Sequence, residues 1–198
     1  MPERNRKLQH FINAVETAIR ARARDFPDAM AMTDRIFTAL QDDGGAETGI
    51  PPCRLPVCDY LEQALDQARG GPISEFADAF AGLEPQFAWS RRPESAQVGA
   101  DFYDNHANAV IVGDHGLEER GDVRIGVSLV APGVHYPRHH HPPEELYAVL
   151  SSGKWMQNDN PLVAKQSGDL VHNLPNAWHA MQAMETAPLL AVWCLWTG

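Results

Sequence analysis

The chain has 198 residues and a formal net charge of −10, with 26 acidic and 16 basic side chains. This charge disfavours nucleic acid as a partner, because phosphate binding needs a basic surface. The 44% hydrophobic and 21% charged residues are typical of a globular protein, and no apolar run approaches the roughly 18 residues that a membrane span needs. We therefore expect a globular protein that binds neither nucleic acid nor membrane.

The first stretch, MPERNRKLQHFINAVE, is amphipathic, unlike the apolar segment of a secretory signal. This predicts a cytoplasmic location. The three cysteines, Cys53, Cys58 and Cys194, are odd in number and contain no CxxC pair. A disulfide framework or a thiolate zinc site is thus disfavoured, and we expect buried or half-buried thiols.

Helical periodicity dominates the first part of the chain. Apolar residues recur there at steps of three and four and form one stripe: Leu8, Phe11, Ile12, Val15 and Ile19. Pro27 interrupts this pattern, and a second helical stretch follows up to Leu40. The composition of residues 42–52 predicts a loop, and a third helix is expected at 57–69. One more short helix is predicted after residues 70–72.

Beyond residue 85 the pattern changes to short segments rich in β-branched and aromatic residues, divided by Gly, Pro, Asn and Asp. These segments are NAVIVG, VRIGVSLV, ELYAVL, KWMQ and PLLAVWCLW. Short strands separated by turn residues predict an all-β sandwich or barrel. We therefore expect a mainly β protein, with a helical region at 1–85 that packs on a β-barrel at 86–198.

The segment ELYAVL at 145–150 carries apolar side chains on both faces of a strand. Neither face should then meet bulk water. The outer face of the barrel is expected to be covered by the N-terminal helices or by a second subunit, so a homodimer is possible.

The richest stretch is HYPRHHHPPEELY at 135–147, which holds four histidines, two glutamates and two tyrosines. Side chains two positions apart on a strand point to the same face, so His139 and His141 can reach one ion together. Glu145 and Tyr147 form a second pair of this kind. The later segment GDLVHNLPNAWH ends in His179.

Three imidazoles and one carboxylate would form a mixed nitrogen and oxygen site. Imidazole suits zinc, iron, nickel, copper or cobalt, and the carboxylate adds a ligand that manganese and iron(II) accept. We therefore predict one divalent transition metal ion, held by His139, His141, Glu145 and His179. Four protein ligands leave an open position only on a five- or six-coordinate ion, which favours a catalytic site over a closed structural one.

These residues resemble the two motifs of the cupin family. The first motif, G(X)5HXH(X)3E…G, matches at Gly133, His139, His141, Glu145 and Gly153. The second is similar at Gly168, Pro175 and His179, although Ala177 replaces the usual glycine. The resemblance implies that the barrel is a cupin, a double-stranded β-helix or jelly roll.

Within the cupins, the chain resembles the bacterial dimethylsulfoniopropionate (DMSP) lyases, particularly the DddQ-like group, which have a helical region before the cupin. The similarity lies in HHHPPEELY, in VGADF at 98–102, in Tyr136 and in the final LWTG. It implies β-elimination of DMSP, a small zwitterion, to dimethyl sulfide and acrylate.

The residues can meet the demands of this reaction. Tyr147 lies on the same strand face as Glu145, and a nearby cation would favour the phenolate that acts as base; a packed tyrosine that hydrogen-bonds a ligand is the alternative. Aromatic faces bind sulfonium cations, which makes Tyr136, Trp155 and Trp178 candidates. Tyr136 has the wrong parity to face inward unless a bulge lies near Pro137, but the family resemblance favours it as a catalytic residue.

Two other classes of function remain open from the sequence. Cupins host many reactions, so an iron(II) dioxygenase or an isomerase would use the same ligands. A non-catalytic cupin that binds a small molecule or a metal is the third possibility.

Overall fold

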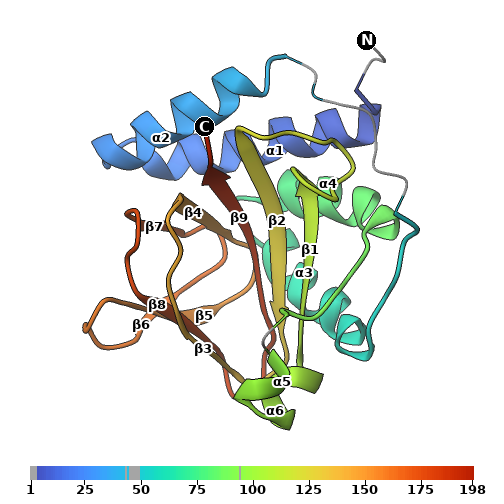
Figure 1. The fold of residues 1–198 in the computed structure, drawn as a ribbon, viewed down its shortest axis with the longest axis vertical. Helices are drawn as coiled ribbons and strands as arrows, with labels where there is room; N and C mark the ends of the chain where they lie inside the picture. The colour runs from blue at the N-terminus through green and yellow to red at the C-terminus, as the bar shows by residue number, and fades with distance from the viewer. Residues whose placement is uncertain (1–3, 43, 45–49, 94) are drawn as a thin grey trace.

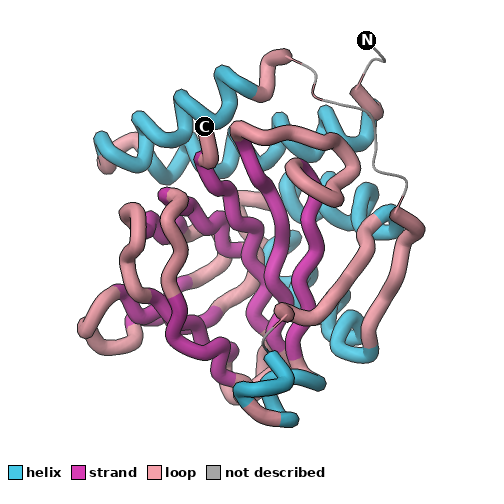
Figure 2. Tube along the Cα trace, viewed as in Figure 1, coloured by secondary structure: helices cyan, strands magenta, loops and turns pink. Residues whose placement is uncertain are grey.

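The computed structural model describes residues 4–42, 44, 50–93 and 95–198. Helices fill the first part of the chain and strands the second (Figures 1 and 2). The α-helices are α1 (Arg6–Ala23), α2 (Pro27–Ala39), α3 (Leu61–Arg69), α4 (Ser74–Leu83), α5 (Ser95–Val98) and α6 (Ala100–Asp104), and two 3-10 helices are η1 (Pro56–Tyr60) and η2 (Glu84–Gln86). Most of the loop predicted at 42–52 lies outside the described residues.

The helix boundaries follow local chemistry. The side chain of Asn5 caps α1 by accepting a hydrogen bond from the backbone N–H of Lys7 at 2.9 Å. Pro27 occupies the first turn of α2, where its missing N–H leaves no bond unmade. The predicted break at this proline is therefore confirmed. The helix predicted at 57–69 begins with η1 and continues as α3.

Nine strands follow among the described residues and form two antiparallel sheets. They are β1 (His106–Val112), β2 (Val123–Val130), β3 (His135–His139), β4 (Glu144–Val149), β5 (Gly153–Gln157), β6 (Val163–Lys165), β7 (Leu170–Asn173), β8 (His179–Ala183) and β9 (Leu189–Trp196). The larger sheet has the order β1-β2-β9-β4-β7 and the smaller one β3-β8-β5-β6. Glu145 of the larger sheet lies 3.2 Å from His179 of the smaller one, so the two sheets face each other.

Helices α1, α2 and α3 pack on the larger sheet, whereas α5 and α6 lie at the opposite end of the strands from α1 and α2 (Figure 1). Helix α1 contacts β4 and β7, while α2 and α3 contact β9. Arg35 of α2 pairs with Glu144 of β4 and lies 5.8 Å from the ring centre of Trp196. One hydrophobic core joins the helices to the strands. The prediction that helices shield this sheet is confirmed, whereas the division at residues 85 and 86 stays a prediction.

The three thiols differ in exposure. Cys58 and Cys194 are buried, as expected, but Cys53 is exposed. Among the described residues, no helix is both long and apolar enough to cross a membrane.

Gly126 makes room for an aromatic side chain between the sheets. It lies opposite Trp193 in the β2–β9 pair. A Cβ atom at Gly126 would lie 2.2 Å from the Trp193 ring and 2.5 Å from the carbonyl oxygen of Ala109. The backbone oxygen cannot move aside as a flexible side chain can, so only glycine fits.

Gly126→Ala should therefore lower the free energy of unfolding by about 1–3 kcal/mol, the usual cost of overpacking. Chemical denaturation with a fluorescence readout measures it. Gly82→Ala in α4 is the matched control: its new Cβ meets nothing within 4 Å, and alanine favours the helix by about 0.5–1 kcal/mol. Equal stability of the Gly126→Ala variant and the wild type would contradict the steric argument.

Candidate metal centre

A β-bulge in β3 determines which side chains enter the space between the sheets. In the β3–β8 pair, Tyr136 lies opposite Met181 and His139 opposite His179, so three steps on β3 match two on β8. The extra residue brings Tyr136 and His139 to one face, with ring centres 5.1 Å apart. Tyr136 could face inward only if a bulge lay near Pro137, and the structure has a bulge there.

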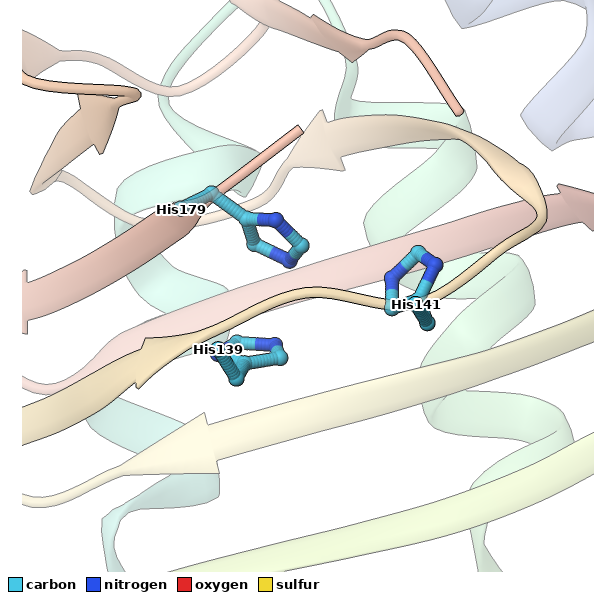
Figure 3. A group of neighbouring side chains, drawn as sticks. All are labelled: His139, His141 and His179. Carbon is cyan, nitrogen blue, oxygen red and sulfur yellow. The ribbon is translucent and has the colours of Figure 1, made fainter. Parts of the chain in front are cut away.

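Three histidines converge on one point between the sheets (Figure 3). His139 ends β3, His141 follows it in the loop, and His179 begins β8. One ring nitrogen from each lies within 4.8 Å of the others. The ring centre of His179 is 4.1 Å from that of His139 and 5.1 Å from that of His141.

The other nitrogen of each ring is held by the backbone. Nδ1 of His139, His141 and His179 lies 2.9 Å from the carbonyl oxygen of Pro137, Pro143 and Ala177, respectively. A carbonyl only accepts, so each Nδ1 donates its hydrogen. Each neutral ring therefore keeps its Nε2 lone pair for a ligand, and the Nδ1 bond fixes the ring orientation.

Glu145 of β4 approaches this group from the opposite sheet. Its Oε2 atom lies 3.4 Å from Nε2 of His141 and 3.2 Å from Nε2 of His179. It also accepts a hydrogen bond of 2.9 Å from Nδ2 of Asn173. Burial alone would raise the pKa of this carboxyl, but His141, His179 and Asn173 outweigh burial and lower it. A buried carboxylate thus faces the imidazoles.

Burial and neighbouring charges set the protonation of the three rings. Burial, together with the charge of His179, lowers the pKa of His139 to about 3. Burial also lowers the pKa of His179, against the charge of Glu145. For His141, burial acts downward, but the hydrogen bond and charge of Glu145 leave the pKa raised.

The donor set fits a divalent transition metal ion. His179 is 1% exposed, and its Nε2 atom has no hydrogen-bond partner among the described residues. Because Nδ1 of His179 holds the hydrogen, Nε2 and the nearby carboxylate oxygen are two acceptors facing each other. A cation would relieve this arrangement, and neutral imidazole with carboxylate suits zinc, iron, manganese, cobalt or nickel.

Two tyrosines flank the histidines. Tyr147 is buried on β4, and its ring centre lies 6.3 Å from that of His179. Burial raises its pKa well above the usual value, and Glu145 and Tyr136 raise it further. Burial also raises the pKa of Tyr136, whose hydroxyl accepts a long bond of 3.5 Å from Asn108. Both phenols are therefore neutral when no cation is near.

The two candidate tryptophans lie in different surroundings. Trp155 of β5 is buried opposite Met181, its ring centre is 6.3 Å from that of Tyr147, and its Nε1 has no hydrogen-bond partner among the described residues. Trp178 is 39% exposed, and its ring packs against His140 at 4.1 Å and against the Arg138 guanidinium at 4.4 Å. The structure brings Trp155 next to Tyr147 but places Trp178 on the surface.

Glu144, the neighbour of Glu145 on β4, points to the opposite face of the strand, away from the histidines. Glu144 is largely buried, and its Oε1 atom lies 2.7 Å from Nε2 of His172. It also pairs with Arg35, because α2 packs on this face of the sheet. His140, between the two histidines of this segment, is exposed.

Other residues of the site were not singled out from the sequence. Asn173 and Gln157 are joined by a hydrogen bond of 2.7 Å and lie behind Glu145. Arg92 precedes α5, and its guanidinium lies 5.9 Å from the Tyr136 ring centre. Gln157 lies two positions after Trp155 on β5, so strand alternation alone could have placed the two side chains on one face. Nothing in the local sequence marks Asn173 or Arg92.

Comparison with known proteins gives consistent matches. The sequence model of the dimethylsulfoniopropionate lyase family matches residues 28–191. The chain is 26% identical over 163 residues to dimethylsulfoniopropionate lyase DddQ of Ruegeria pomeroyi, covering 82% of this chain and 79% of that protein.

Two sets of solved structures have a similar fold. One, of the DMSP lyases RdDddP and RnDddQII, matches with a TM-score of 0.74 and 25% identity, covering 96% of this chain and 92% of the other. The structure of DddQ from R. pomeroyi DSS-3 matches with a TM-score of 0.73 and 23% identity, covering 95% and 91%. Because each match covers at least 95% of this chain, the similarity includes both the helices and the two sheets.

Metal affinity should depend on pH through one proton. The pKa of His141 is raised, so below it the ring is protonated on the side of Glu145, and a metal must displace this proton. His139 and His179 are already neutral there. We expect the dissociation constant for zinc to be independent of pH above the pKa of His141. Below that pKa it should rise about tenfold for each pH unit that the pH falls. Chelator competition from about pH 6 to about pH 9 measures this; constant affinity over the range would contradict it.

Proposed function

The chain belongs to the dimethylsulfoniopropionate lyase family, and on this premise we propose that it cleaves DMSP to dimethyl sulfide and acrylate. The observation that carries the proposal is the family match over residues 28–191, which includes the whole histidine group. In this β-elimination a Cα–H bond and the C–S bond break, a C=C bond forms, and the C–S electron pair leaves with the sulfur. One proton is released, and no oxidant is needed.

His139, His141, His179 and Glu145 would hold one divalent transition metal ion: zinc, iron, manganese, cobalt or nickel. Three Nε2 lone pairs and a carboxylate oxygen directed at one place support this assignment. When bound, such a cation supplies positive charge that neutralises the substrate carboxylate and favours the phenolate of a nearby tyrosine.

Tyr147 is the proposed base that takes the Cα proton. Its place on β4, two residues after Glu145, puts the phenol beside the histidines rather than in solvent. Its raised pKa means that it needs the cation before it can accept a proton. Tyr136, which lies beside His139, is proposed as the second catalytic tyrosine that lines the substrate space.

The sulfonium end of the substrate carries a positive charge and two methyl groups. The indole of Trp155, buried beside Tyr147, offers an aromatic face of the kind that binds such cations. Trp178 is the weaker candidate, because its ring already carries the guanidinium of Arg138.

Other cupin reactions, such as an iron(II) dioxygenase, an isomerase or a non-catalytic binding protein, are less favoured, because the family match covers most of the chain. We further propose that residues 86–198 form the cupin barrel and that 1–85 serve as its helical cover. A cytoplasmic location and a homodimer remain proposals from the sequence.

The decisive experiment incubates the purified protein with DMSP and each of the five metals in turn. We expect equal amounts of dimethyl sulfide in the headspace and of acrylate in solution, also under anaerobic conditions, because elimination consumes no oxygen. Prior removal of metal with a chelator should abolish release. Product that forms only when oxygen is consumed would move the protein to the dioxygenases.

Replacing the proposed base separates catalysis from metal binding. Tyr147→Phe should lower kcat by about 10²–10⁴-fold, the usual contribution of a positioned base, while metal content stays the same. Tyr60→Phe, at an exposed tyrosine, is the matched control. An unchanged kcat in Tyr147→Phe would make Tyr147 a packing residue instead.

A further inference from the structure

We propose that Asn173, itself oriented by Gln157, is a positioning residue that fixes the Glu145 carboxylate toward the three histidines. The inference rests on the proposed role of Glu145 as a metal ligand. The amides of Asn173 and Gln157 act through Glu145 and contact neither the ion nor the substrate themselves.

A buried hydrogen bond joins Asn173 to Glu145. Nδ2 of Asn173 donates to Oε2 of Glu145 at 2.9 Å, and both residues are buried, at 1% and 3% exposure. The two residues lie directly opposite each other in the β4–β7 pair, so the strand register holds the bond in place. The same Oε2 atom approaches the histidine Nε2 atoms. Asn173 therefore selects the oxygen that faces a bound cation.

The orientation of the Asn173 amide is fixed by a second amide. Asn173 has a donor and an acceptor that are similar in shape, so it could present either one to Glu145. Gln157 removes this choice: its Nε2 donates to Oδ1 of Asn173 at 2.7 Å and to the carbonyl oxygen of His172 at 2.6 Å. With Oδ1 occupied, only the Nδ2 group of Asn173 can reach the carboxylate.

The hydrogen bonds through these two amides link the two sheets. Gln157 belongs to β5 and lies opposite His179 in the β5–β8 pair, whereas Asn173 and Glu145 belong to the larger sheet. The amide chain thus ties the strand next to His179 to the strand that carries Glu145. It fixes the position of the carboxylate relative to the imidazole across the gap between the sheets.

A neutral amide suits this task because it satisfies the carboxylate without cancelling its charge. A lysine or arginine in this place would form an ion pair and compete with a cation. Outer hydrogen bonds of this kind commonly change metal affinity by about 10–100-fold, so the effect should be measurable on binding alone.

The test measures Zn²⁺ affinity by chelator competition and records the visible spectrum of the Co²⁺-loaded protein. In Asn173→Leu we expect zinc binding weaker by about 10–100-fold and a changed Co²⁺ spectrum, because the carboxylate loses its orientation. The side chain of Gln157 makes no hydrogen bond to the carboxylate or to an imidazole nitrogen among those it forms with His172 and Asn173. Gln157→Met should therefore also weaken zinc binding, but by a smaller factor than Asn173→Leu. Asn13→Leu on the exposed face of α1 is the control and should bind as the wild type does.

The result that would overturn the proposal is zinc affinity within about twofold of the wild type in both variants, since an outer-ligand effect is larger. A merely structural role would lower the melting temperature of the metal-free protein and leave the affinity and the Co²⁺ spectrum of the folded fraction unchanged. If Asn173→Leu does not fold, Gln157→Met alone decides. Release of dimethyl sulfide by the wild type is measured separately, so failure of the proposed function is distinguishable from failure of this inference.

Discussion

Three imidazole rings meet between two sheets, and short backbone contacts fix the orientation in which their Nε2 atoms would face a cation. Each Nδ1 donates to a carbonyl two residues away along its own chain segment. The partner is thus local and does not depend on a distant side chain. Burial then keeps His139 and His179 unprotonated, so lone pairs rather than hydrogens face Glu145. The chemistry proposed for Tyr147 depends on this arrangement, because its phenol is neutral without a nearby cation.

The helices contribute to the site from outside the sandwich. The outer face of β4 carries Glu144, which pairs with Arg35 of α2 and with His172 of β7. The next residue along β4 is Glu145, which faces inward. Helix packing on one face therefore fixes the strand whose other face presents the carboxylate. This coupling gives the helical region a role in the position of the site as well as in covering apolar surface.

The interior also contains polar atoms that folding leaves unsatisfied. Nε2 of His179 and Nε1 of Trp155 are buried without hydrogen-bond partners among the described residues, and the ring centre of each residue lies 6.3 Å from that of Tyr147. Each such atom lowers stability unless a ligand satisfies it.

The sequence by itself determined the order of helices and strands, the break at Pro27, and the shared face of Glu145 and Tyr147 on β4, because the period of a helix or strand is written in neighbouring residues. Strand alternation does not account for the place of His141, which lies in the loop after β3. Only the tertiary structure decided that Tyr136 faces inward and that Trp178 lies on the surface. The bulge in β3 and the path of the loop before β8 shift side chains in ways that strand alternation does not report. The amides of Asn173 and Gln157 also emerged only from the fold. Their roles come from which strands lie side by side and which sheets face each other, and that information is distributed over the whole chain.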